Sequence, residues 1–172
     1  MPELRTPPIL SSINSQNVEW ACQKYGLTTE ELLNLKRHAV AAKDTAYCPY
    51  SKFRVGAVLL TKVGAYIQGA NVENAAYPVG TCAERVALGK AVTEGHRDFK
   101  AIAVATDISP PASPCGMCRQ FIREFCDLKM PIVMYDKDGN FRIVVLEDLL
   151  PMSFGPEDLG ERSTSTDIPS VA

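Results

Sequence analysis

The stretch Phe99-Lys100-Ala101-Ile102-Ala103-Val104-Ala105-Thr106 decides the fold, because it is almost wholly apolar apart from Lys100. Such a run is typical of a strand that is covered on both faces. We therefore expect residues 99–106 to lie at the centre of a sheet. Helices packed on the two faces would supply the cover, so the run favours an α/β domain.

Hydrophobic periodicity predicts the elements around this strand. The first helix is expected from about 29 to 46, since Thr28 and Glu31 have capping-box spacing and apolar residues follow at steps of three and four. Further elements are expected as a hairpin with strands at 53–61 and 65–71, helices from about 82 to 95 and 115 to 126, strands at 131–135 and 141–145, and a helical turn at 146–150. This order describes a layered α/β domain.

Length and composition predict one domain with two extensions. A chain of 172 residues with 46% hydrophobic content can bury one core and is short for two. Residues 1–26 are rich in Pro, Ser and Asn, and we expect a flexible arm there, with a short turn near Val18 to Trp20. The domain is expected at 27–161. The Ser/Thr-rich residues 162–172 are expected to be a disordered tail.

Charge and hydropathy restrict the partners and the compartment. The chain carries 18 basic and 20 acidic residues, with no Lys/Arg cluster longer than a pair, so we expect no nucleic-acid partner. No apolar run has membrane-spanning length, and the first residues lack a signal or transit pattern. Six cysteines without such a signal favour a reducing compartment. We expect a cytoplasmic protein, with access to the nucleus left open.

Three cysteines have the pattern of a metal site. They lie in Thr81-Cys82-Ala83-Glu84-Arg85 and in Pro114-Cys115-Gly116-Met117-Cys118-Arg119. Cys115 and Cys118 are neighbours on one helical face, and each segment begins a predicted helix whose positive end favours thiolates. Three thiolates leave a tetrahedral zinc ion one ligand short, and an open fourth position is typical of a catalytic zinc site.

Charged residues near these cysteines have candidate roles. Arg85 and Arg119 are expected to offset the excess negative charge of three thiolates by hydrogen bonding to sulfur. Glu84 has two interpretations, since Thr81-x-x-Glu84 is a capping box and a hydrolytic zinc site also needs a proton shuttle. The metal cluster favours the shuttle. Because residues two apart on a helix face different ways, Cys82 and Glu84 can share a site only if the ion lies off the helix end.

Two other interpretations of the cysteines stay open at this stage. Cys115-x-x-Cys118 could be a redox dithiol, although it follows a Pro-rich loop late in the chain. A closed structural zinc site would need a fourth protein ligand. The residues of suitable type are His38, His96, Cys22, Cys48 and Cys126, and none has motif spacing from the other three.

Five sequence blocks resemble one family, the small homotetrameric cytidine deaminases that act on free nucleosides. The resemblance covers about residues 33–159. The blocks are Cys48-Pro49-Tyr50-Ser51-Lys52-Phe53-Arg54-Val55-Gly56-Ala57, Asn71-Val72-Glu73-Asn74-Ala75-Ala76-Tyr77, the two cysteine segments through Gln120, and Ser153-Phe154-Gly155-Pro156-Glu157-Asp158-Leu159. The resemblance implies a three-layer α/β/α sandwich around a mixed five-stranded sheet. It also implies hydrolysis of cytidine and 2'-deoxycytidine to uridine and 2'-deoxyuridine plus ammonia, in pyrimidine salvage.

The resemblance further implies roles for individual residues. One Zn²⁺ per subunit is held by Cys82, Cys115 and Cys118, and Glu84 takes a proton from the bound water. Residues implied to bind the nucleoside are Phe53 on the pyrimidine ring, Asn71 and Glu73 on the ribose, Ala75 and Ala83 nearby, and Tyr77 and Phe154 from a neighbouring subunit of a homotetramer. Asn71 and Glu73 would point to one side of an extended segment. Their alternative role is to stabilise the loop.

Three rival functions share parts of this pattern. A deaminase of blasticidin-type nucleoside antibiotics would share the cysteine blocks, but Glu73 beside Asn71 favours a ribose-binding enzyme. A non-catalytic zinc module would bind zinc without exchangeable water. An editing deaminase acting on DNA or RNA is disfavoured by the acidic balance of the chain.

Overall fold

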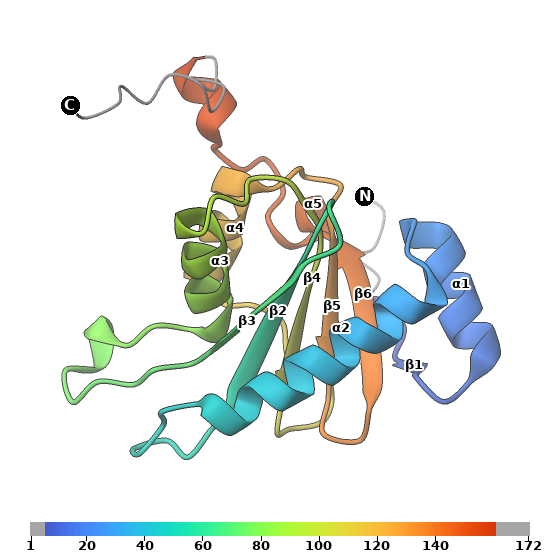
Figure 1. Ribbon diagram of the computed structural model, residues 1–172, viewed down its shortest axis with the longest axis horizontal. Helices are drawn as coiled ribbons and strands as arrows, with labels where there is room; N and C mark the ends of the chain where they lie inside the picture. Colours follow the sequence, from blue (N-terminus) through green and yellow to red (C-terminus); the bar gives the residue numbers. More distant parts are fainter. Residues whose placement is uncertain (1–5, 161–172) are drawn as a thin grey trace.

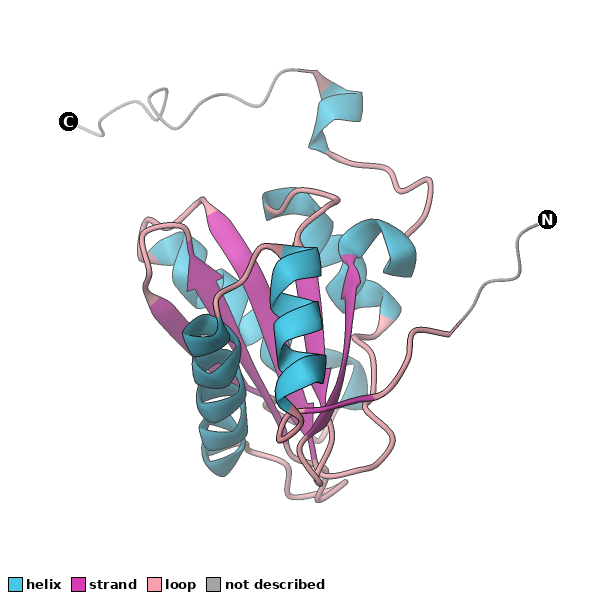
Figure 2. Ribbon diagram, turned by 90° about the vertical axis from the view of Figure 1, so that its right-hand side faces the viewer, coloured by secondary structure: helices cyan, strands magenta, loops and turns pink. Residues whose placement is uncertain are grey.

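A mixed sheet with helices on both faces organises the chain, as Figures 1 and 2 show in the computed structural model, which describes residues 6–160. Within that range the sheet has six strands in the order β1-β6-β5-β4-β2-β3, and only β4 and β5 pair in parallel. The strands are β1 (Leu10–Ser11), β2 (Val55–Thr61), β3 (Tyr66–Ala70), β4 (Phe99–Thr106), β5 (Pro131–Tyr135) and β6 (Asn140–Val145). The interior position predicted for 99–106 is confirmed, since β4 lies between β2 and β5.

Helices form the outer two layers, so the predicted three-layer arrangement is confirmed. They are α1 (Ser15–Tyr25), α2 (Thr29–Ala42), α3 (Ala83–Thr93), α4 (Gly116–Phe125) and α5 (Leu146–Leu149), with 3-10 turns η1 (Lys43–Thr45), η2 (Tyr77–Val79) and η3 (Pro156–Leu159). Residues of α1 and α2 share one core cluster with the sheet, and residues of α3, α4 and α5 share the other. None of the helices in residues 6–160 combines the length and the apolar character that crossing a membrane requires.

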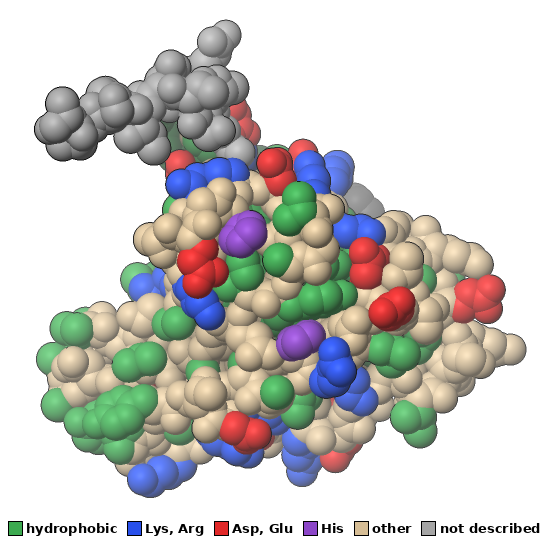
Figure 3. All heavy atoms as spheres, viewed as in Figure 1, with side chains coloured by type: hydrophobic (Ala, Val, Ile, Leu, Met, Phe, Trp, Pro, Cys, Tyr) green, Lys and Arg blue, Asp and Glu red, His purple; other side chains and the backbone are tan. Residues whose placement is uncertain are grey.

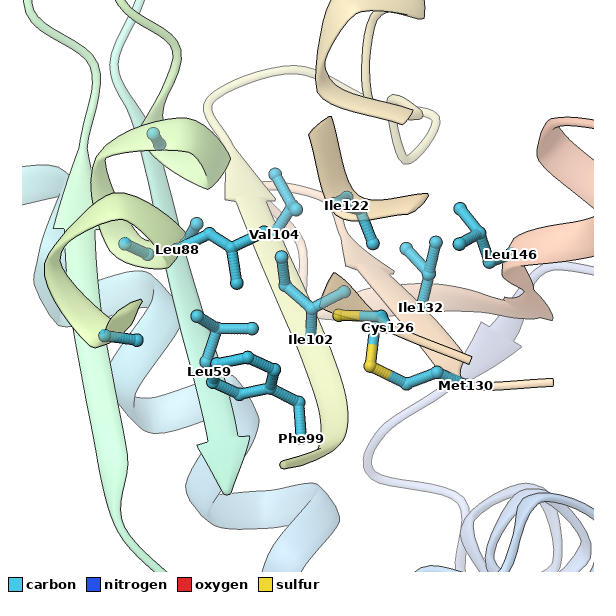
Figure 4. Packing of buried hydrophobic residues seen from close by; sticks show 14 of the residues in the cluster. Leu59, Leu88, Phe99, Ile102, Val104, Ile122, Cys126, Met130, Ile132 and Leu146 are labelled. Atoms are coloured by element: carbon cyan, nitrogen blue, oxygen red, sulfur yellow. The ribbon is translucent and has the colours of Figure 1, made fainter. Parts of the chain in front are cut away.

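Alternating side chains of the central strands supply both core layers. In β2, Ala57 and Leu59 belong to the cluster under α3 and α4, whereas Val58 and Leu60 belong to the cluster under α2. All four are at most 1% exposed. Figure 4 shows the first cluster, where Leu59 lies among apolar side chains from β4, α3 and α4. A strand turns successive residues to opposite faces, so a continuous apolar run can fill two cores at once.

The amino-terminal segment differs from the expected flexible arm. Residues 10–25 form β1, which pairs with β6, and α1, which Asn14 caps by accepting a hydrogen bond from the backbone N–H of Asn17. Val18, Ala21 and Cys22 are buried against the sheet. These three buried residues are surrounded in the sequence by polar ones, so the hydrophobic periodicity of a helix is weak here. β1 is also the reason for six strands where five were expected, while the tail at 162–172 lies outside the described residues.

The capping box expected at Thr28 is present and ties α2 to the sheet. The Glu31 backbone N–H donates to Thr28 Oγ1, the Thr28 N–H donates to Glu31 Oε2 at 2.8 Å, and Lys100 Nζ of β4 donates to Glu31 Oε1 at 2.6 Å. Burial alone would raise the pKa of Glu31, but the hydrogen bonds from Lys100 and Thr28 outweigh it, and the pKa is lowered. The helix ends at Ala42 rather than at 46, because η1 tightens the chain there.

Replacing Glu31 with Gln should make the stability of the protein less dependent on pH. The glutamine keeps the box but loses the charge on the Lys100 contact, which we expect to cost about 0.5–1 kcal/mol near neutral pH. Because the native pKa of Glu31 is lowered, its contribution is complete above the unfolded value of about 4.5 and is lost as the pH falls through the native value. Denaturant unfolding from pH 3 to 8 measures this, with Glu30→Gln as the control, and parallel curves for the two variants would contradict the prediction.

Two glycines in the hairpin permit close contact with helices. A Cβ on Gly56 would lie 2.1 Å from the carbonyl oxygen of Ala39 in α2. A Cβ on Gly69 would lie 2.4 Å from the backbone nitrogen of Ala87 in α3. Both obstacles are backbone atoms, which cannot be relieved by a rotamer change, so the helices depend on glycine at these positions to approach the sheet.

Gly69→Ala and Gly89→Ala should have opposite effects on the free energy of unfolding. Gly69→Ala pushes α3 away from β3, and we expect destabilisation of about 3 kcal/mol or more. Gly89 lies within α3 with open space around its Cβ position, so alanine there should add about 0.5–1 kcal/mol through helix propensity. Thermal and denaturant unfolding of the two purified variants compares them, and equal stabilities would refute the close-contact argument.

Candidate active site

Three cysteine sulfurs meet where α3 and α4 begin. Cys82 is the N-cap of α3, Cys115 is the N-cap of α4, and Cys118 lies in the first turn of α4. Their sulfurs lie within 4.8 Å of one another, with 3.8 Å between Cys82 and Cys115 and 3.5 Å between Cys115 and Cys118. A tetrahedral zinc ion with Zn–S bonds of about 2.3 Å spaces its sulfurs by about 3.8 Å, so these three fit it.

The surroundings of the cluster favour a thiolate at Cys82. A hydrogen bond with the Cys118 thiol lowers the pKa of the Cys82 thiol to about 5, and Arg85 contributes to the lowering. The pKa of Cys118 is raised, because its proton is held in that hydrogen bond and because the residue is buried. The hydrogen bond between Cys82 and Cys118 thus favours the thiolate at Cys82 and the thiol at Cys118.

The two arginines predicted to offset thiolate charge have different surroundings. Arg85 Nη2 lies 3.8 Å from Cys82 Sγ, and this hydrogen bond raises the pKa of the guanidinium. Arg119 instead donates to the carbonyl oxygens of Pro114 and Leu149 and to the Ser113 hydroxyl, at 2.8 to 2.9 Å. The structure thus gives Arg119 a role in holding the loop before α4, and its predicted contact with sulfur is not among its hydrogen bonds. These contacts could not be predicted from the sequence, because the acceptors are backbone carbonyls and one of them is 30 residues away.

Glu84 is buried beside the cysteine cluster and does not cap its helix. The residue is 4% exposed, and the backbone N–H of Thr81, which a capping box would assign to Glu84, donates to the Val72 carbonyl instead. Burial raises the pKa of the Glu84 carboxyl, and negative charge on Cys82 raises it further. Because Cys82 precedes the first helical residue, it points off the helix end and can share a site with Glu84, as the sequence required.

A cavity of about 600 Å³ opens onto this cluster. Cys82, Cys115 and Glu84 line one part of it, and Phe53, Asn71 and Glu73 line another. A volume of this size suits a small organic molecule rather than a polymer. The cavity therefore places two of the three sulfur-bearing residues and a buried carboxyl against the residues predicted to bind substrate.

Asn71 and Glu73 hold the loops that form the cavity wall. The Asn71 side chain accepts from the Val55 N–H at 2.8 Å and donates to the Phe53 carbonyl at 2.9 Å. Glu73 accepts from the backbone N–H groups of Tyr50 and Ser51. Hydrogen bonding by Ser51 is the main reason that the pKa of Glu73 is lowered. The loop-stabilising role considered for both residues is thus present. Asn71 Oδ1 keeps a second lone pair for a ligand, whereas Glu73 Oε2 accepts from both N–H groups, so the remaining acceptor capacity of Glu73 lies on Oε1.

Other predicted binding residues are divided between the cavity and the rest of the surface. Tyr77 lines the cavity of its own chain with 76% of the residue exposed. Ala75 and Ala83 do not line it, although Ala83 adjoins Cys82 and is fully buried. Phe154 is 59% exposed and lies away from the cavity lining, where Gln120 Nε2 donates to its carbonyl oxygen. Substrate contacts by these four residues stay predictions.

Several cavity residues escaped the sequence reasoning. Val104 and Thr106, at the carboxyl end of β4, line the cavity together with Ala112 and Ser113 from the following loop. A signal was available for the first two, since residues two apart on a strand share a face. Ala112 and Ser113 gave no such sequence signal, because the position of their loop depends on the Arg119 hydrogen bonds.

The rival interpretations of the cysteines are less consistent with the structure. Among residues 6–160, the metal-ligating groups that come together are Cys82, Cys115 and Cys118 alone. His38 instead contacts Gln68 and stacks on Tyr66, and Cys22 and Cys126 lie in the two cores. A redox dithiol needs only two cysteines, so the presence of Cys82 beside Cys115 and Cys118 favours a metal site over a dithiol. Three cysteine sulfurs at zinc spacing, a buried carboxyl and an adjoining cavity are the arrangement expected of a hydrolytic zinc site.

Comparison with known proteins assigns the chain to a family with this site. Residues 29–134 match the family model of the cytidine and deoxycytidylate deaminase zinc-binding region. A cytidine deaminase of Sporosarcina psychrophila is 49% identical over 118 residues, covering 69% of this chain and 87% of the relative. One from Halalkalibacterium halodurans is 45% identical over 127 residues, covering 74% and 96%. The chain belongs to the cytidine deaminase family, whose members use one zinc ion each.

A solved structure supports the same assignment at the level of the fold. The crystal structure of cytidine deaminase from Burkholderia pseudomallei matches with a TM-score of 0.70 and 43% sequence identity. The match covers 71% of this chain and 98% of that chain.

Cys115→Ala should abolish stoichiometric zinc binding. Removing one of three thiolates leaves a two-ligand site, and zinc affinity should fall by at least about 10²-fold, since changes in the surrounding shell already cost 10- to 100-fold. Metal content after dialysis, together with competition against a chromogenic chelator, measures the loss. Cys48→Ser is the matched control, because Cys48 lies outside the cluster and should leave one zinc per chain. A Cys115→Ala protein that keeps a full complement of zinc would reject the ligand assignment.

Proposed function

We propose that this protein hydrolyses cytidine and 2'-deoxycytidine to uridine and 2'-deoxyuridine with release of ammonia. The observation that carries the proposal is a set of three sulfurs at zinc spacing, bordering a cavity that also contains the buried carboxyl of Glu84. The family assignment supports the same reaction.

Cys82, Cys115 and Cys118 would hold the zinc ion. When bound, zinc supplies Lewis acidity that lowers the pKa of a coordinated water from about 15.7 toward about 7. Glu84 would take one proton from the attacking water and deliver it to ring N3, so that C4 becomes electrophilic and the water oxygen bonds to it. Glu84 would then carry the remaining proton of that oxygen to the amino group, the C4–N bond would break, and ammonia would leave with a C4 carbonyl in its place. A carboxyl whose burial raises its pKa is suited to both steps, because it accepts and holds a proton more readily than an exposed carboxyl does.

The opposite wall of the cavity would bind the nucleoside. Phe53 offers an aromatic face to the pyrimidine, and its position is fixed by the Asn71 side chain, which donates to its carbonyl. Asn71 and Glu73 would bind the ribose hydroxyls with the lone pairs that their backbone contacts leave free. Hydrogen bonds that hold the wall in place before substrate arrives reduce the entropy cost of binding.

The enzyme would work as a cytoplasmic homotetramer in pyrimidine salvage, with Tyr77 and Phe154 reaching neighbouring cavities. Exposed aromatic and apolar residues support self-association, since Tyr47, Tyr50, Tyr77 and Val79 are 48% to 76% exposed. Figure 3 shows hydrophobic side chains gathered at the lower left, over the loops before β2 and after β3. A patch of this kind on one side of a molecule is typical of an interaction surface.

Incubation of the zinc-loaded protein with cytidine tests the proposal directly. Uridine and ammonia should form in equal amounts, and prior chelation should stop the reaction until zinc is restored. Blasticidin S supplied as a competing substrate separates the ribose-binding enzyme from the antibiotic deaminase. Unchanged cytidine with a full complement of zinc would instead support a non-catalytic zinc module.

Glu84→Gln should retain zinc and lose about 10³-fold or more in kcat, because glutamine keeps the shape of the side chain but cannot carry the proton. Steady-state kinetics with cytidine and measurement of bound zinc make the comparison. Glu94→Gln, at the far end of α3, removes an equal charge from an exposed side chain and should behave as wild type. A kcat of Glu84→Gln close to that of the wild type would show that Glu84 does not carry the proton.

A further inference from the structure

The segment that carries Phe154 is fastened to α4 by one buried arginine. Arg123 is 3% exposed, its Nε donates to Ser153 Oγ at 3.0 Å, and its Nη2 pairs with Glu157. Gln120, one turn earlier on α4, donates from Nε2 to the Phe154 carbonyl at 3.0 Å. The chain is therefore held on both sides of Phe154 and at Phe154 itself.

The contact between Arg123 and this segment is close. A Cβ on Gly155 would lie 2.2 Å from Arg123 Nη2 and 2.3 Å from Cζ, so the guanidinium packs directly against the Gly155 backbone. Gly155 N–H also donates to Asp158 Oδ2 at 2.7 Å, which closes the turn into η3. A buried guanidinium is costly unless it is hydrogen-bonded and paired, and here Nε and Nη2 of Arg123 both contact this segment.

Phe154 does not line the cavity of its own chain. The residue is 59% exposed. In Figure 1, η3, just beyond Phe154, lies at the top of the molecule, whereas the loop after β3, which carries cavity residues, lies at the lower left. A catalytic contribution from Phe154 would therefore be made to the cavity of another copy of the chain, as the proposed homotetramer requires.

We propose that Arg123 is a positioning residue for catalysis in a neighbouring subunit, since it fixes the backbone on both sides of Phe154 and holds that ring outward for the other cavity. The proposal rests on the proposed deaminase function and homotetramer. The Arg123 guanidinium contacts Ser153, Gly155 and Glu157, and these contacts set the position of the Phe154 ring. Without it, Phe154 would keep only the Gln120 bond and would be free to reorient.

Kinetics of Arg123→Met test the coupling to Phe154. Methionine keeps an apolar stem in the buried site, and we expect kcat/KM for cytidine to fall by about 10- to 100-fold, as a misplaced substrate contact does. Phe154→Ala should fall by a similar factor, and the double variant should match Phe154→Ala within about twofold, because Arg123 acts through that ring. Lys129→Met is the control, since it removes an exposed ion pair with Glu147 and should behave as wild type. Additive losses in the double variant would overturn the proposal.

Mixed oligomers test whether the effect crosses between subunits. Arg123→Met and Glu84→Gln chains with different tags are co-expressed and purified through both tags. In the hybrid, an intact Glu84 cavity can receive a well-held Phe154 from a Glu84→Gln neighbour, so activity per Glu84 site should exceed that of Arg123→Met alone by several-fold. Activity equal to Arg123→Met alone would place the defect within its own subunit and overturn the proposal.

Folding and assembly are measured on the same samples. Arg123→Met should keep one zinc per chain and the oligomeric state of wild type by analytical ultracentrifugation, and a monomeric variant would overturn the proposal by assigning Arg123 to assembly. Should Arg123→Met not fold, Ser153→Ala removes only the Nε contact and should give a smaller loss in the same direction. A wild-type protein that leaves cytidine unchanged refutes the proposed function, whereas an active wild type with an unaffected Arg123→Met refutes this inference alone.

Discussion

The close contact between α3 and the hairpin is the constraint on which the site depends. Gly69 leaves space for the backbone of Ala83 and Ala87, both fully buried, so the helix lies directly on β3. At this distance the start of α3 reaches the carboxyl end of β4, where Val104 and Thr106 line the cavity. Cys82 and Glu84 are delivered to one place because the helix that carries them cannot lie further from the sheet without losing this packing.

The cavity wall is held by side chains that also face its interior. Asn71 joins Phe53 and Val55 through one amide, and Glu73 joins the backbone at Tyr50 and Ser51 through one carboxylate. Asn71 and Glu73 thus determine both the shape of the cavity and the polar groups that it offers to a ligand. Substituting either residue should therefore alter substrate contacts and loop position together. A change in KM alone is not the expected result, because the moved loop should affect kcat as well.

Much of the fold and of the metal site could be predicted from sequence, because both depend on local signals. The apolar run at 99–106 indicated an interior strand, and cysteine spacing indicated the three ligands that the structure brings together. α1 was missed because its buried stripe of Val18, Ala21 and Cys22 is short and surrounded by polar residues. The surroundings of Arg119 could not be predicted, since its Leu149 partner is 30 residues away and is a backbone carbonyl, which every residue offers.

The surroundings of Arg119 leave Arg85 as the arginine that hydrogen-bonds to a ligand sulfur. With Cys82, Cys115, Cys118 and Glu84 all ionised, Arg85 would offset one of four negative charges by direct contact, while Arg119 keeps its charge but donates to neutral carbonyl and hydroxyl oxygens. The protein alone avoids that state, since the pKa values of Cys118 and Glu84 are raised. A divalent cation offsets two more charges, so zinc binding and proton release form one linked equilibrium. Arg85 then determines how much negative charge remains on the sulfurs, and hence how strongly the bound ion can act as a Lewis acid.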